Sequence, residues 1–126
     1  MSMWAEQGLL DKVTEILADV DWDHHFGRPF VTAYQLAIEL QHRYPDVVEA
    51  IDRPVGGVET GQRNSLAQYL ANQLSRAIKA DPSFPVEGAG LWGGHMSELV
   101  FVVDGRPVRS SLVGTPYPLS MFRLRD

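Results

Sequence analysis

The sequence predicts one α+β domain over residues 1–126, with three or four helices followed by a small antiparallel sheet. Apolar residues recur at helical spacing through the first two thirds of the chain. The β-rich run 99–103 is followed by Asp104-Gly105, a dipeptide that favours a tight hairpin turn. A chain of 126 residues with 44% hydrophobic residues is long enough to bury a core of its own.

The stretch 4–20 predicts an amphipathic first helix whose outer face is acidic. Aspartates then stand beside His24 and His25, and both residue types are metal ligands. Adjacent histidines point apart in a helix or a strand, so we predict no metal site here. Residues 19–30 are expected to form a loop in which Trp22 and Phe26 pack inward.

Residues 32–44 carry the clearest helix start. Thr32 and Gln35 have the spacing of a capping box, in which each side chain bonds the backbone N–H of the other residue. Pro45 is expected to end this helix, because the residue before a proline avoids the helical conformation. A short helix is expected next, with Asp46 as its N-terminal cap.

A glycine-rich loop leads into a helix over 65–79. Ser65 and Gln68 repeat the spacing of a capping box. Three leucines and Ile78, at every fourth position, predict a buried stripe. The opposite face carries side chains that form hydrogen bonds or are positively charged: Gln68, Asn72, Ser75, Arg76 and Lys79.

Glycine and proline are frequent after this helix, which predicts a connector with a short strand at 86–91. A β-hairpin is expected at 98–113 and a last strand at 119–125. Helices followed by a hairpin resemble the winged-helix arrangement. In that comparison 65–79 is the recognition helix and 98–113 the wing, with residues 80–97 between them.

The composition excludes several kinds of site. The chain has no cysteine, which excludes disulfides and thiolate zinc sites and fits a cytoplasmic protein. No apolar run reaches about 18 residues, so no membrane span is expected. Gly56 and Gly61 have the P-loop spacing, but Gln62 and Arg63 replace its lysine and its Ser or Thr. There is no nucleophile elbow and no cofactor motif, so we predict no catalytic residues and no cofactor.

The leading functional prediction is a small non-catalytic binding or regulatory domain that contacts another protein. A second copy of the chain is among the candidate partners. The prediction rests on small size, a formal net charge of −5, and a polar helix face beside a glycine-rich loop.

Two alternatives stay open. Asn and Gln can pair with adenine and Arg with guanine, so the helix could read nucleic acid. The residues predicted to contact a partner or nucleic acid are Arg63, Gln68, Asn72, Arg76, Lys79, Arg106 and Arg109. The second alternative is an anion or small-molecule site at Gly56–Ser65, where a helix N-terminus offers free N–H groups. Its predicted residues are Gly57, Gly61, Asn64 and Ser65.

Overall fold

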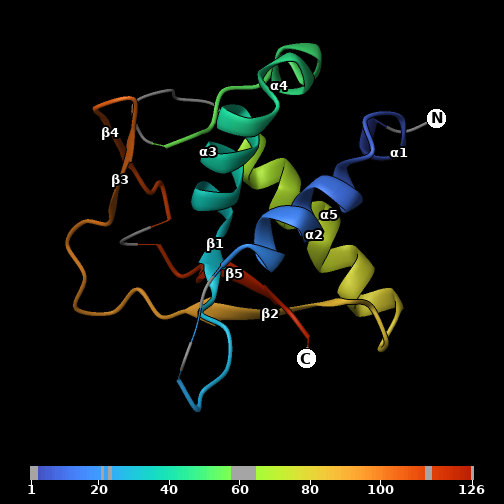
Figure 1. Ribbon diagram of the computed structural model, residues 1–126. Helices are drawn as coiled ribbons and strands as arrows, with labels where there is room; N and C mark the ends of the chain where they lie inside the picture. The colour runs from blue at the N-terminus through green and yellow to red at the C-terminus, as the bar shows by residue number, and fades with distance from the viewer. Residues whose placement is uncertain (1–2, 21, 23, 58–64, 113–114, 126) are drawn as a thin grey trace.

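Helices predominate in the first two thirds of the chain, and four of the five described strands follow the last helix, which confirms the predicted α+β class (Figure 1). The computed structural model describes residues 3–20, 22, 24–57, 65–112 and 115–125. The helices are α1 (Met3–Glu6), α2 (Leu9–Ala18), α3 (Ala33–Arg43), α4 (Pro45–Ile51) and α5 (Leu66–Ala80). The strands are β1 (Val31–Thr32), β2 (Val86–Leu91), β3 (Val100–Val103), β4 (Arg106–Arg109) and β5 (Leu119–Leu124). None of the described helices has the length and apolar character to cross a bilayer.

The last strand, β5, is the centre of a three-stranded sheet. The two-residue strand β1 pairs with one side of it and β2 with the other, both antiparallel. The β2 ladder ends where Leu91 lies opposite Leu119. The connection between β2 and β5 therefore leaves the sheet and returns to it at this point.

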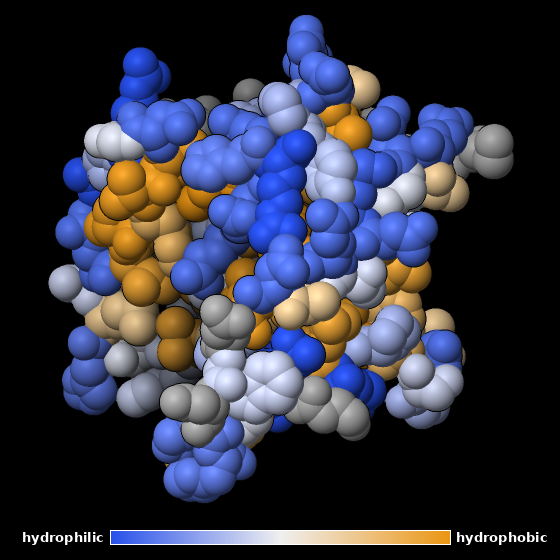
Figure 2. Space-filling model, viewed as in Figure 1, coloured by the Kyte–Doolittle hydropathy of each residue, from blue (hydrophilic) through white to orange (hydrophobic). Residues whose placement is uncertain are grey.

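The hairpin of β3 and β4 lies within the predicted range 98–113 but forms a two-stranded sheet of its own. Asp104 and Gly105 make its turn with positive φ angles of 50° and 78°, which such turns require. Figure 1 shows the hairpin standing to the left of the helices, away from the three-stranded sheet. Apolar side chains gather over this hairpin in Figure 2.

The apolar stripes of α2, α3 and α5 meet above the three-stranded sheet (Figure 1). Burial of such stripes stabilises helices more than their intrinsic propensity does. The largest fully buried side chains are Leu9, Val13, Leu17, Leu36, Leu40, Leu66, Leu70, Leu74 and Val86. The leucines predicted to form the buried stripe of 65–79 are among them.

The predicted helix over 4–20 is divided in two. Gly8 has a φ of 60°, a left-handed conformation that ends α1 and precedes α2. Glycine adopts this conformation without the steric penalty that other residues suffer. The apolar stripe on which the prediction rested begins at Leu9, so it indicated α2 and carried no information about residues 4–8.

Pro45 begins a helix and does not simply end one, so the prediction that Asp46 caps α4 is wrong. Tyr44 is the N-cap residue, and Pro45 occupies the first turn. Proline suits this position because its missing N–H would have no partner within the helix. Asp46 follows in the first turn, where its negative charge interacts favourably with the positive end of the helix dipole.

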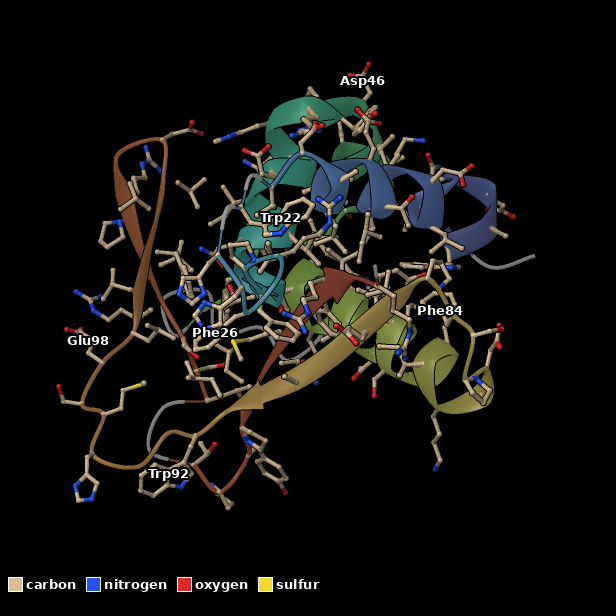
Figure 3. All side chains as sticks on the ribbon, turned by 60° about the horizontal axis from the view of Figure 1, so that its bottom comes forward. Trp22, Phe26, Asp46, Phe84, Trp92 and Glu98 are labelled. Carbon is tan, nitrogen blue, oxygen red and sulfur yellow. The ribbon has the colours of Figure 1, made fainter. Side chains whose placement is uncertain are left out.

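The prediction that Trp22 and Phe26 pack inward is also wrong, because their side chains are 43% and 76% exposed. The guanidinium of Arg28 lies 4.1 Å from the centroid of the Trp22 ring. The Phe26 ring packs edge-on against the rings of His24 and His25. Both exposed side chains, labelled in Figure 3, thus have their ring contacts with residues of the same loop.

Candidate binding groove beside α5

An open cavity of about 820 Å³ lies between the first half of α5, the start of α3, and residues 111–112 and 117–120. We call it the α5 groove. It is lined by Ala33, Tyr34, Gly57, Ser65, Ala67, Gln68, Ala71, Asn72, Ser111, Leu112, Tyr117, Pro118, Leu119 and Ser120. Its volume is within the usual range for protein binding pockets.

Every described residue that lines the α5 groove is uncharged. Charged residues make up 21% of the chain, so a neutral lining of this size is a distinctive property of the site. Alanine, leucine and proline side chains supply its apolar surface, while hydroxyls and carboxamides supply its polar groups. A mostly apolar cavity with a few polar groups is the usual composition of a binding site.

The carboxamides of Gln68 and Asn72 lie one helical turn apart along α5, and both side chains are exposed. The backbone N–H of Gln68 donates to the Oγ of Ser65 at 3.2 Å, as the predicted capping box requires. In the α3 box the Thr32 N–H also donates to the Gln35 Oε1 at 2.8 Å. No such reciprocal bond joins the Ser65 N–H to the Gln68 side chain among the described residues. Gln68 is exposed and is one of the residues that line the groove.

Tyr34 of α3 forms the opposite wall and anchors the segment that follows β4. Its hydroxyl accepts the backbone N–H of Ser111 at 3.0 Å and lies 3.3 Å from the Ser111 Oγ. Its ring stacks on Phe101, with centroids 5.2 Å apart. One side chain therefore holds both the hairpin and residue 111 against α3.

Two exposed aromatic residues stand at the end of the β2 and β5 ladder. Trp92 is 73% exposed and Tyr117 is 69% exposed, and they lie just beyond the pair of Leu91 and Leu119. Figure 3 shows Trp92 past the end of β2, at the edge of the molecule. Tyr117 also lines the α5 groove. Exposed Tyr and Trp are the residues that most often supply binding energy at protein interfaces.

The N-terminus of α5 has few donors left for an anion. The backbone N–H groups of Leu66 and Ala67 donate to the carbonyls of Pro54 and Val55 at 2.7 and 3.0 Å. The next N–H group, that of Gln68, donates to the Oγ of Ser65. The predicted anion residues Gly61 and Asn64 lie outside the described residues, while Gly57 and Ser65 line the groove. The described geometry thus gives the anion alternative no support.

The predicted contact residues divide between two places. Gln68, Asn72, Arg76 and Lys79 are exposed on α5, and Arg63 lies outside the described residues. Arg106 and Arg109 are on β4, at the left of Figure 1, whereas α5 is at the right.

The hairpin is held toward α3. At its tip, the Asp104 carboxylate lies 3.6 Å from the Nε2 of His42. At its base, Arg109 is paired with Glu98, which is labelled in Figure 3. The two β4 arginines therefore do not extend the face formed by Arg76 and Lys79.

A second cavity of about 550 Å³ lies between α2, α3 and β3. Three charged residues line it, and Arg43 pairs with the other two, Asp19 at 2.7 Å and Glu39 at 2.9 Å. The pair with Asp19 joins the C-cap of α2 to α3, and the pair with Glu39 lies within α3, so both have a structural role. In the described part of the chain, no group of three or more His, Asp or Glu residues could hold a metal ion.

The sequence predictions include one wall of the α5 groove and omit the other. Gly57, Ser65, Gln68 and Asn72 were predicted site residues, whereas Tyr34 and residues 111–112 and 117–120 were not. An aromatic residue between two prolines, at Pro116-Tyr117-Pro118, was the only local signal.

No family model, curated protein or solved structure matches the chain.

Proposed function

We propose that this chain is a non-catalytic binding domain whose α5 groove holds a segment of another protein. The observation that carries the proposal is the uncharged lining of a cavity of about 820 Å³, bordered by the exposed ring of Tyr117. Interface cores are depleted of charged residues and enriched in aromatic ones. The groove has this composition while the chain as a whole is acidic.

The groove offers poor support for catalysis. General acid–base chemistry needs a side chain that titrates near the working pH, and a serine nucleophile needs a base beside it. The described lining contains no His, Asp, Glu, Lys or Arg. Its hydroxyls and carboxamides are suited to holding a ligand by hydrogen bonds.

Site-specific photo-crosslinking in the native host tests the proposal. A benzophenone amino acid at Tyr117 should crosslink to a protein, while the same probe at Asp46, exposed on α4 and labelled in Figure 3, should not. Adding Asn72→Trp, which fills the groove from an exposed position, should remove the crosslink. Equal crosslinking from both positions, or crosslinking that Asn72→Trp leaves unchanged, would contradict the proposal.

Nucleic-acid binding is the second candidate, because the strand order supports a winged-helix-like reading. The interval 80–97 contains β2, which follows α5 closely and pairs with β5. The wing would then be the whole connection 92–118, which carries the hairpin. Against this reading, the hairpin packs on α3, and its Arg109 is already paired.

A titration with short duplex DNA separates the two candidates. Nucleic-acid binding predicts an affinity that falls steeply between about 50 and 200 mM salt. It also predicts that Arg76→Gln combined with Lys79→Gln removes binding, while Arg106→Gln has a lesser effect. Such a result would replace the protein partner with nucleic acid as the ligand of α5.

A further inference from the structure

We infer that the α5 groove takes an extended peptide segment with two chemical features. A bulky uncharged side chain enters the groove, and acidic residues two to four positions away contact Arg76 and Lys79. The inference rests on the proposed function and specifies the chemistry of its partner.

The spacing of the two carboxamides matches an extended chain. Gln68 and Asn72 are four residues apart, which is about 6 Å along a helix. An extended strand repeats the groups on one side every two residues, or about 6.6 Å. Each carboxamide has both donors and an acceptor, so the pair can bond every second peptide unit of a strand that runs along α5.

The neutral lining determines what the groove can accept. Ala67 and Ala71 leave room on the α5 side, and Leu112 and Leu119 supply apolar surface on the other. Burying a charge without a partner is strongly unfavourable, and no described lining residue could pair with one. The anchoring side chain is therefore apolar or aromatic, and its neighbours in the strand point away from the groove.

The charge of α5 determines what lies beside this anchor. Arg76 and Lys79 continue the exposed face of Gln68 and Asn72, and α5 contains no acidic residue. Among the described residues, neither side chain has an ion-pair partner. They follow Asn72 by about 6 and 10 Å along the helix, which is two to three residues of an extended chain. Acidic side chains at these positions would meet complementary charge.

Selection from a random peptide library displayed on phage, with the whole chain as bait, tests the inference. The selected peptides should share an apolar or aromatic residue with Asp or Glu two to four positions away. Synthetic peptides are then titrated by fluorescence anisotropy. The combined change Gln68→Ala and Asn72→Ala should weaken binding by about tenfold or more, while Gln73→Ala, on the same helix but outside the groove lining, should not.

The charge requirement has a separate control. Arg76→Gln with Lys79→Gln should weaken the selected peptide by about tenfold but leave a version with its acids replaced by Gln unchanged. Arg106→Gln, an exposed arginine on the hairpin, should change neither.

Each remaining outcome is decisive. A library that yields no binder, or peptides without the acidic positions, overturns the inference. If Tyr117 still crosslinks to a protein in that case, the proposed function stands with a partner of other chemistry. Loss of both the crosslink and the peptides removes both proposals, and salt-sensitive binding of duplex DNA in their place assigns the helix to nucleic acid.

Discussion

Gly56, near the start of the glycine-rich loop, packs closely against the N-cap residue of α5. Its φ is 125°, and an added Cβ would lie 2.8 Å from the Oγ of Ser65, the N-cap of the helix. Gly56→Ala should therefore lower the free energy of unfolding by about 1–3 kcal/mol. Urea denaturation measures this loss. Gly93→Ala is the control, because a Cβ there meets nothing within 4 Å, and an equal loss at both sites would contradict the account.

Asp81 follows α5 and has a pKa below the ordinary value of an aspartate. The main cause is the hydrogen bond from the Ser83 hydroxyl, with the Ser83 N–H second, at 2.8 and 2.9 Å from Oδ1. Because this pKa is lower in the folded state, the stabilisation is present above the unfolded-state pKa and is lost as pH falls through the folded-state pKa.

Ser83→Ala removes the hydroxyl donor and should raise the pKa of Asp81 toward its ordinary value. The stability of this variant should consequently fall less steeply on the acid side. An NMR titration of the Asp81 carboxyl carbon measures the pKa directly. An unchanged pKa in Ser83→Ala would show that the hydroxyl is not the cause.

At the scale of elements, Tyr34 links α3 to the segment after β4. Tyr34→Phe removes the hydroxyl that accepts the Ser111 N–H and should cost about 1 kcal/mol of stability. Hydrogen exchange at the Ser111 amide should also become faster. Tyr69→Phe is the matched control on α5, since the Tyr69 hydroxyl has no hydrogen bond among the described residues. Equal effects of the two variants would exclude the link.

Short sequence patterns correctly predicted a capping box and a turn that depend on residues close together in the chain. The capping box of Thr32 and Gln35 forms as expected, and so does the turn at Asp104 and Gly105. The two-residue strand β1 was not predicted, because it exists only by pairing with β5 about ninety residues later. The N-cap of α4 was predicted too late, at Asp46. Tyr44, the residue before Pro45, is both the C-cap of α3 and the N-cap of α4.

At the scale of the whole molecule, the α5 groove is assembled from segments that are distant in the sequence. Its α5 wall was predicted, because the helical period alone separates Gln68 and Asn72 from the buried leucines. The opposite wall depends on β5 pairing with β2, which returns residues 117–120 to the side of α5. No local pattern encodes that return, so the neutral cavity is visible only in the folded chain.

The most direct test of the α5 groove is an NMR map of backbone and side-chain amide shifts as a selected or crosslinked peptide is added to the labelled chain. The account predicts the largest changes at the side-chain amides of Gln68 and Asn72, with further changes at Leu112 and Tyr117. Residues of α2 and α4 should stay unchanged. Changes confined to the β3 and β4 hairpin, or to the cavity between α2 and α3, would contradict the assignment of this groove as the binding site.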